Sequence, residues 1–483
     1  MAVHDSGQSI GNGLTDRRTL LAGGAGALTA AVASRVSAIA KQRGQGGVSK
    51  PVPEPEPDPR PNFVLIITDD MRGTDWRALK KTRKALRSSS WYPNFIVDAS
   101  LCSPSRASIL TGQYTHNHGV EWNNSEEFEG GFSTYQKNGL DRLSIPYVLQ
   151  QEGYRTGLVG KFMNGLRPGM NQPAGWDRFV ASYTTEYYDF PLLIDDEQVN
   201  FRGAASYKTD VLADLAVDFI AGTPVDQPLF LQFSPTGPHV PETPAKRHQS
   251  AFPTAFVTRD GSFNEPDVSD KPAGIQALSP LTPEQQVDLD LQERNRLRAM
   301  LAVDEAIVKV VNALRAANRI DKTHIFIVSD NGYLMGQHRV IGKATPYDQA
   351  IRVPMLAWGP DFPSRTNNSL VGNIDIAPTI ASLAGTRMPR PDGKSLLDPG
   401  RRDYMFIQLR YIGMGIRSSR LMYFEYGNGE REYYDLRNDP LELVNLLPPG
   451  SPADPDPPSG LPRVSELSLR LAYLRKCSGE RCR

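Results

Sequence analysis

Residues 62–70, NFVLIITDD, place an apolar run directly before two aspartates. A continuous apolar run, in which polar residues do not alternate with apolar ones, is typical of a strand that is buried on both faces of a sheet. Four more runs of this kind follow, at residues 156–160, 228–234, 323–329 and 353–358. The sequence therefore predicts a large, mostly parallel sheet whose first strand begins at Asn62.

Helical patterns separate these strands. Residues 209–221 carry apolar side chains at positions i, i+4 and i+8, and helical patterns also cover residues 282–318 and a stretch that ends at Gly385. Strands that alternate with helices predict an α/β domain, here a sheet sandwiched by helices. After about residue 400 the pattern changes to short β-rich segments around a Gly-Asn-Gly turn, which predict a smaller C-terminal antiparallel sheet.

The N-terminal part of the chain has a different composition. Arg17 and Arg18 precede an Ala/Gly/Leu run with small residues behind it, which is the pattern of a twin-arginine export signal. Residues 41–61 are rich in Gly and then in Pro, as in an extended linker. We therefore expect a signal peptide over 1–40, a linker over 41–61, a main domain over 62–400 and an α+β subdomain over 401–483. Such a protein is exported by the twin-arginine machinery of a bacterium, to the periplasm or beyond the cell.

Charge and cysteine content narrow the function further. Lys+Arg and Asp+Glu both number 54, so no overall positive field attracts nucleic acid, and we expect no nucleic-acid partner. Of the three cysteines, Cys477 and Cys482 lie close together and most simply form a local disulfide in an oxidising compartment, the alternative being two free surface thiols. Cys102 is then alone, and is buried, modified or reactive.

Polar side chains follow the ends of four apolar runs. They are Asp69 and Asp70, Lys161, His239, and Asp330 with Asn331. Because open α/β sheets bind ligands outside the carboxyl ends of their strands, we expect these side chains to converge, although each alone also fits a helix cap or a turn. Three carboxylates and a carboxamide are hard oxygen ligands that suit Ca²⁺ or Mg²⁺ and not zinc. Positive groups around such a metal indicate an oxyanion ester as substrate, and four side chains could supply them: Arg106, Lys161, His239 and Lys343.

Residues 102–112, CSPSRASILTG, resemble the signature of the sulfatase family. The segments NFVLIITDDM, TGLVGK, SPTGPHVP, SDNGYLMGQHRVIGKATPYDQAIRVP and YYDLRNDPLELVNL resemble further landmarks of that family in the same order, so the resemblance covers about residues 61–447. The pattern is most similar to the branch of N-acetylglucosamine-6-sulfatases and arylsulfatases. The resemblance implies an alkaline phosphatase-like fold and hydrolysis of a sulfate ester, either a sulfated glycan or an aryl sulfate, to alcohol and sulfate.

The resemblance also implies a role for each candidate residue. Cys102 would be converted to formylglycine by a formylglycine-generating enzyme, and its modified side chain would serve as nucleophile and metal ligand. Arg106 would orient that side chain, and His239 would contact the ester oxygen or protonate the leaving alcohol. Lys161 and Lys343 would hold sulfate oxygens. A divalent ion, Ca²⁺ in preference to Mg²⁺, would be bound by Cys102 together with Asp69, Asp70, Asp330 and Asn331.

One departure and two alternatives stay open. Many members of the family have a histidine two residues after the lysine, whereas this chain has Met163 there, so no proton-relay role is assigned to it. A phosphate or phosphonate monoester hydrolase of the same superfamily is one alternative, and an inactive binder of sulfated glycans, with Cys102 unmodified, is the other. His116 and His118, which follow the signature closely, are expected to support the loop and helix more than to act in the pocket.

Overall fold

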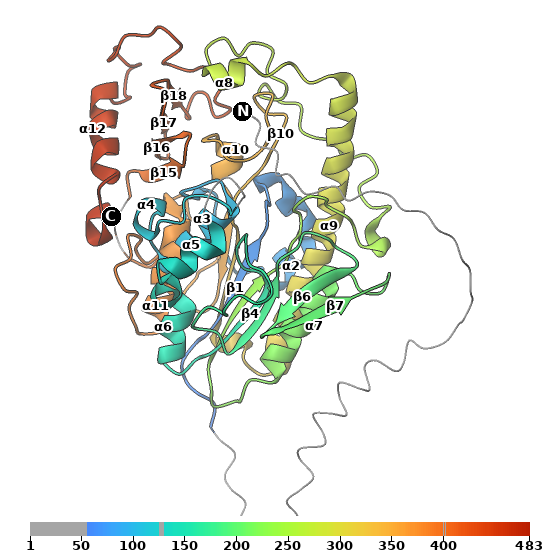
Figure 1. The fold of residues 1–483 in the computed structure, drawn as a ribbon. Helices are drawn as coiled ribbons and strands as arrows, with labels where there is room; N and C mark the ends of the chain where they lie inside the picture. The colour runs from blue at the N-terminus through green and yellow to red at the C-terminus, as the bar shows by residue number, and fades with distance from the viewer. Residues whose placement is uncertain (1–55, 125–129, 399, 401) are drawn as a thin grey trace, which may run out of the picture. The chain divides into compact units, whose positions relative to one another are not determined.

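A ten-stranded sheet forms the centre of the computed structural model, which describes residues 56–124, 130–398, 400 and 402–483 (Figure 1). The predicted signal peptide and most of the predicted linker lie outside the described residues. In order across the sheet the strands are β13 (Arg365–Thr366), β2 (Ser90–Tyr92), β12 (Met355–Trp358), β9 (Thr323–Ser329), β1 (Asn62–Thr68), β8 (Leu229–Ser234), β4 (Arg155–Lys161), β5 (Arg178–Ser182), β6 (Phe190–Ile194) and β7 (Glu197–Phe201).

The five strands from β9 to β5 are parallel, and the predicted strands among them lie within a residue of their expected bounds. The predicted strand at 353–358 is β12, but it pairs antiparallel with β9. Residues 190–201 form the antiparallel hairpin of β6 and β7 at one edge of the sheet. The sheet is therefore mixed at both edges and parallel in the middle.

The side chains of β1 show why the middle of the sheet is buried on both faces. Phe63, Leu65 and Ile67 belong to one hydrophobic cluster, and Val64 and Ile66 belong to the other. The second cluster includes apolar side chains of α7 (Lys208–Ala221) and α9 (Pro283–Ala316), and α9 also packs against α2 (Lys80–Ala85). The first cluster includes side chains of α3 (Cys102–Thr111), α5 (Gly131–Lys137), α6 (Ile145–Gln151) and α11 (Ile376–Leu383). Figure 1 shows these two groups of helices on opposite sides of the sheet.

The predicted C-terminal antiparallel sheet is present. It runs in the order β15 (Met405–Leu409), β16 (Gly413–Arg417), β17 (Leu421–Tyr426) and β18 (Arg431–Asp435), and α12 (Val464–Leu474) packs against it. Its apolar side chains join the same hydrophobic cluster as those of α3. Cys477 and Cys482, just after α12, form the expected disulfide.

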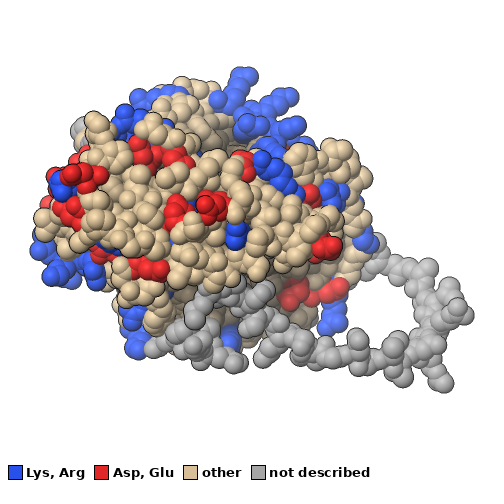
Figure 2. All heavy atoms as spheres, turned by 90° about the horizontal axis from the view of Figure 1, so that it is seen from above, with Lys and Arg blue, Asp and Glu red and all other residues tan. Residues whose placement is uncertain are grey.

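The remaining elements are short. They are the two-stranded sheets β3 (Phe95–Ile96) with β14 (Val371–Gly372) and β10 (Leu334–Met335) with β11 (Ile341–Gly342), and the helices α4 (Thr115–His118), α8 (Ala273–Gln276) and α10 (Asp348–Ile351). In the described part of the chain, none of the helices is long and apolar enough to cross a membrane. On the face drawn in Figure 2, Lys and Arg lie in groups along the upper edge and also at the left and the lower left, while Asp and Glu are scattered among uncharged residues.

Candidate active site

The candidate site lies at the carboxyl ends of four neighbouring strands. Asp69 and Asp70 follow β1, Lys161 is the last residue of β4, and Asp330 follows β9, with Asn331 next to it. His239 stands in the loop that follows β8. Because the sheet order is β9-β1-β8-β4, these ends are adjacent, and the predicted convergence is what the structure has.

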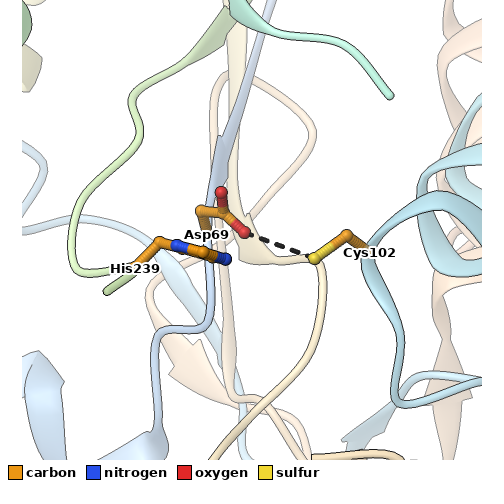
Figure 3. A group of neighbouring side chains, drawn as sticks. All are labelled: Asp69, Cys102 and His239. Atoms are coloured by element: carbon orange, nitrogen blue, oxygen red, sulfur yellow. Dashed lines mark hydrogen bonds between the residues drawn. The ribbon is translucent and has the colours of Figure 1, made fainter. Parts of the chain in front are cut away.

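Asp69 lies at the centre of the group. Its Oδ1 is 3.5 Å from Cys102 Sγ, and its Oδ2 accepts a hydrogen bond of 2.7 Å from Lys161 Nζ. Figure 3 shows Asp69 between Cys102 and His239, which come from separate parts of the chain. Burial alone would raise the pKa of Asp69, but the charges of Lys161 and of its other neighbours lower it strongly. Asp69 is therefore a carboxylate in the site.

Asp70 is held in an unusual backbone conformation. Its φ is 63°, in the left-handed region that residues other than glycine rarely adopt. Its N–H donates to Asp330 Oδ1 at 3.1 Å, and the Nδ2 of Asn331 donates to its Oδ1 at 2.6 Å. The same oxygen accepts a hydrogen bond of 2.7 Å from Lys343 Nζ. These bonds fix the carboxylate beside Asp69 and Asp330.

Cys102 is the first residue of α3, and it is both free and completely buried. Its Sγ is 2.8 Å from Lys343 Nζ and 4.0 Å from Asp70 Oδ1. Burial raises the pKa of the thiol to about 12, and the charges of Lys161 and Lys343 offset only part of that rise. An unmodified Cys102 would therefore be a protonated thiol at neutral pH and a poor nucleophile.

Arg106, one turn further along α3, is also completely buried. Its Nε donates to Asp330 Oδ2 at 2.8 Å, and its Nη1 donates to the carbonyl oxygen of Lys161 at 2.8 Å. Its Nη2 lies 4.0 Å from Asp69 Oδ1 and has no hydrogen-bond partner among the described residues. The guanidinium thus joins three of the converging segments and keeps one donor group available.

His239 has one ring nitrogen within 4.8 Å of ligand atoms of both Asp69 and Cys102. Its Nδ1 is 2.7 Å from the carbonyl oxygen of Val240, and because a carbonyl only accepts, Nδ1 carries a hydrogen. Its Nε2 therefore faces Asp70, with 3.8 Å between Nε2 and Oδ2. The hydroxyl of Tyr187 donates to the carbonyl oxygen of His239 at 2.7 Å and fixes the loop.

The arrangement fits a divalent metal ion. Ligand atoms of Asp69, Asp70, Cys102 and Asp330 all lie within 4.8 Å of one another, and all four residues are buried. The Oδ1 of Asn331 is buried and has no hydrogen-bond partner in the described part of the chain. Buried carboxylates and a carboxamide oxygen are the donors that a hard cation prefers, so the structure has an acidic site suited to a metal.

Several residues that shape the site carry no signal in the sequence. Arg296 of α9 is completely buried, donates to the carbonyl oxygen of Asp70, and donates to Asp75 Oδ2 at 2.9 Å. Asn123 Oδ1 accepts a hydrogen bond of 2.9 Å from the backbone N–H of Ser103 and so caps the first turn of α3. Arg296 belongs to no recognisable motif, and Asn123 begins an N-x-Ser sequon, which does not indicate this contact; only the folded chain brings each to its partner.

The three residues that the sequence analysis set apart lie in supporting positions. Met163 is 2 % exposed and belongs to the hydrophobic cluster of α3, so an apolar side chain occupies the position of the family histidine. His118 Nε2 is 2.9 Å from Ser108 Oγ, and its Nδ1 accepts a hydrogen bond from the N–H of Val120. His116 Nε2 lies 3.0 Å from the carbonyl oxygen of Cys477. His118 therefore joins α4 to α3, and His116 joins α4 to the segment of the C-terminal disulfide.

Comparison with known proteins gives the same picture. The model of the sulfatase family matches residues 61–386. An arylsulfatase of Volvox carteri is 31 % identical over 87 % of this chain and 75 % of its own. An N-acetylglucosamine-6-sulfatase of Homo sapiens is 30 % identical over 88 % of this chain and 86 % of its own.

Solved structures share the fold. A protein solved in complex with its substrate, D-glucosamine-2-N,6-O-disulfate, has a TM-score of 0.71 at 21 % identity and covers 86 % of this chain and 98 % of its own. A phosphonate monoester hydrolase of Agrobacterium radiobacter has a TM-score of 0.59 at 20 % identity and covers 80 % of this chain and 91 % of its own. The large mixed sheet with a separate small antiparallel sheet is therefore the alkaline phosphatase-like fold.

Proposed function

The chain belongs to the sulfatase family, whose members hydrolyse sulfate esters to an alcohol and sulfate, and we propose that it does so on a sulfated amino sugar with a nucleophile derived from Cys102. The observation that carries the proposal is the position of Cys102 Sγ, 3.5 Å from Asp69 Oδ1 and 2.8 Å from Lys343 Nζ at the start of α3. A residue at this point touches both the carboxylates and a cation that can hold an oxyanion.

The proposed nucleophile is the hydrate of formylglycine. A separate formylglycine-generating enzyme, which supplies the oxidant, converts Cys102 to an aldehyde with loss of its sulfur. Water adds to the aldehyde and leaves two hydroxyl groups on one carbon. An unmodified thiol would offer a single nucleophilic atom and no route for releasing sulfate without attack of water on the sulfated enzyme.

The hydrolysis then takes two steps. One hydroxyl gives its proton to water and attacks the sulfur of the ester, the bond between sulfur and the alcohol oxygen breaks, and the leaving alcohol takes a proton from Nε2 of His239. The second hydroxyl next gives its proton to Nε2 of His239, the C–O bond to the sulfate breaks, and the aldehyde forms again as sulfate departs; water then adds to the aldehyde and restores the hydrate. Lys161, Lys343 and Arg106 hold the sulfate oxygens and the hydrate through charge-assisted hydrogen bonds.

The metal ion that we propose for the site is Ca²⁺, with Mg²⁺ as the less suitable ion. The side chains that would hold it are those of Asp69, Asp70, Asp330 and Asn331, together with residue 102 in its modified form. When bound, a divalent cation polarises the sulfate oxygens and favours the ionised form of the nucleophilic hydroxyl. The acidic, oxygen-only donor set supports this choice over zinc.

The amino-sugar substrate rests on similarity within the family. The relatives include an N-acetylglucosamine-6-sulfatase as well as an arylsulfatase, and a structural neighbour holds a sulfated glucosamine. The segment GKFMNG, which has Met163 where many sulfatases have histidine, supports the first of these branches. The fold is shared with a phosphonate monoester hydrolase, so fold alone does not choose between sulfur and phosphorus esters.

We further propose that the protein acts outside the cytosol. Its relatives include extracellular sulfatases, and residues 1–40 have the pattern of a twin-arginine export signal of a bacterium. This route carries folded proteins, which suits a chain whose Cys102 must be modified before export. We propose that residues 62–400 carry the reaction and that residues 401–483 complete the rim of the site.

A comparison of specificity constants tests the proposal. The purified protein is assayed for kcat/KM on N-acetylglucosamine 6-sulfate, para-nitrophenyl sulfate and para-nitrophenyl phosphate. We expect the sugar sulfate to give the highest value and the phosphate the lowest. A kcat/KM for the phosphate above those for both sulfates would overturn the sulfatase assignment. A kcat/KM for the aryl sulfate above that for the sugar sulfate would overturn the proposed substrate class.

A further inference from the structure

The turn between β15 and β16 lies beside the segment that carries Cys102. The backbone N–H of Gln408, in β15, donates to the carbonyl oxygen of Asp98 at 2.8 Å, and that of Ala344 donates to the carbonyl oxygen of Ser100 at 3.1 Å. Residues 98–100 are therefore bonded on one hand to the C-terminal sheet and on the other to the segment of Lys343. The C-terminal sheet thus borders the candidate active site.

A small hydrophobic cluster joins that turn to the residues next to Cys102 and Lys343. Leu101, Trp122 and Ala344 form the cluster, and Ile412 of the turn packs against it. Leu101 precedes Cys102 in the chain, and Ala344 follows Lys343. Ile412 of the turn therefore packs beside the chain neighbours of Cys102 and Lys343, two residues of the candidate site.

Tyr411 stands at the tip of this turn, next to Ile412, and it is 63 % exposed. Its φ of 64° lies in the left-handed region, which costs about 1 kcal/mol or more for a residue other than glycine. Its ring centroid is 6.1 Å from that of Trp122, at an interplanar angle of 70°. The Tyr411 side chain is thus mostly exposed beside Trp122, and its backbone has a conformation that tyrosine rarely adopts.

Charged neighbours fix the position of the Tyr411 ring. The guanidinium of Arg410 lies 5.0 Å from the ring centroid, within the range of a cation–π contact. Arg410 Nη1 is 2.8 Å from Glu121 Oε2, and the other oxygen of Glu121 accepts a hydrogen bond of 2.8 Å from Gln408 Nε2. Glu121 is followed by Trp122 and by Asn123, which caps α3. Tyr411 and the helix that begins at Cys102 are therefore connected through residues 121–123.

We propose that Tyr411 is a specificity-determining residue that stacks against the sugar ring carrying the sulfate. One face of a pyranose ring presents polarised C–H groups, and the negative face of an aromatic ring attracts them while the contact removes apolar surface from water. Arg410 and Glu121 then lie where they can meet the hydroxyl groups at the edge of the sugar. This inference rests on the proposed amino-sugar substrate, and it assigns the recognition of the sugar to the C-terminal sheet.

The test compares Tyr411→Ala with Tyr411→Phe, which keeps the ring and serves as the matched control. The wild type and both variants, each matured to the same extent, are assayed for KM on N-acetylglucosamine 6-sulfate and for the inhibition constant of inorganic sulfate. Inorganic sulfate has no ring and reports on the anion pocket alone. We expect Tyr411→Ala to raise KM by about five- to tenfold, Tyr411→Phe to stay within about twofold, and sulfate inhibition to be equal in all three proteins.

Two results would overturn the inference while leaving the proposed function intact. In one, Tyr411→Ala has the KM of the wild type; in the other, it weakens inhibition by inorganic sulfate as much as it raises KM, which indicates damage to the anion pocket. If the wild type releases sulfate from para-nitrophenyl sulfate but not from the sugar sulfate, the proposed substrate fails and this inference fails with it. Melting curves of the three proteins establish that all are folded.

Discussion

Lys343 Nζ lies 2.8 Å from Cys102 Sγ, although the two residues are 241 positions apart in the chain. The same ammonium group donates to Asp70 Oδ1 at 2.7 Å. Burial disfavours the charged form of Lys343, but the nearby carboxylates, Asp70 first among them, keep its pKa well above the usual value. Lys343 is therefore a fixed positive charge that touches the residue we propose as the nucleophile.

Replacement of Lys343 by alanine should reduce catalysis. A preorganised donor to a developing oxyanion contributes about 10²- to 10³-fold to the rate, so we expect kcat/KM for a sulfate ester to fall by about that factor. The control is Lys81→Ala, which removes an exposed lysine paired with Glu305 at 2.8 Å and should leave kcat/KM unchanged. Equal values for wild type and Lys343→Ala would show that Lys343 does not hold the sulfate.

Removal of a bound metal ion from the acidic site should lower the Tm of the protein. A ligand that binds only the folded state stabilises it by an amount that grows with its concentration, so Ca²⁺ should raise the Tm of protein that has been stripped with a chelator. Asp330→Asn removes one of the three carboxylates and should weaken this rise, whereas Asp361→Asn, at an exposed carboxylate paired with His324, should preserve it. A Ca²⁺-dependent rise of the same size in Asp330→Asn would contradict the ligand set.

Arg296 is expected to position Asp70 without touching the substrate. It donates to the carbonyl oxygen of Asp70 and, at 3.4 Å, to that of Pro238, which precedes His239. Arg296→Lys keeps the charge beside Asp75 but loses the planar fork, so we expect a folded protein with weaker Ca²⁺ binding and a lower kcat at similar KM. Titration of the Tm with Ca²⁺, together with steady-state kinetics, measures both. If the variant has a lower Tm but the Ca²⁺ affinity and kcat of the wild type, Arg296 has a structural role only.

His118 should make the stability of the fold depend on pH. Burial, with a smaller contribution from His116, lowers its pKa from 6.5 to about 3. The unfolded chain protonates His118 near pH 6.5, and the folded chain does so only at pH about 3. The stabilisation from neutral His118 is therefore complete above pH 6.5 and is lost as the pH falls from 6.5 to about 3.

A comparison with His118→Asn isolates this contribution, because groups elsewhere in the chain titrate in both proteins. The free energy of unfolding in urea is measured for both proteins from pH 7.5 to about 5. We expect the advantage of the wild type to shrink as the pH falls, at up to about 1.4 kcal/mol per pH unit. A difference that does not change with pH would mean that His118 takes up its proton over the same pH range in the folded and the unfolded protein, which would contradict the lowered pKa.

Local patterns predict much of the fold. The apolar run at 62–68 coincides with β1, and the helical pattern at 282–318 contains α9, which ends at Ala316. Local patterns do not predict strand direction, because a strand buried on both faces has the same apolar composition whether it pairs parallel or antiparallel with its neighbour. For this reason β12 is recognised as a strand, but its antiparallel pairing with β9 is not.

Some residues at the candidate site can be predicted from the sequence, and others cannot. Asp69, Lys161 and Asp330 are predictable because each stands directly at the end of a buried strand, where a general rule of α/β sheets applies. Arg296 and Tyr411 follow no such rule, since one is a charged residue within a long helix and the other lies in a short turn of a different sheet. The contact of Arg296 with Asp70, and the place of Tyr411 that we propose beside the sugar, depend on how the layers pack, which no local pattern encodes.

The state of residue 102 tests the central claim most directly. The active protein, produced together with a formylglycine-generating enzyme, is digested, and the peptide that carries residues 102–112 is analysed by mass spectrometry. We predict a peptide in which residue 102 has lost its sulfur and reacts as an aldehyde with a hydrazine reagent. An intact thiol at Cys102 in protein that releases sulfate at its full rate would contradict the account.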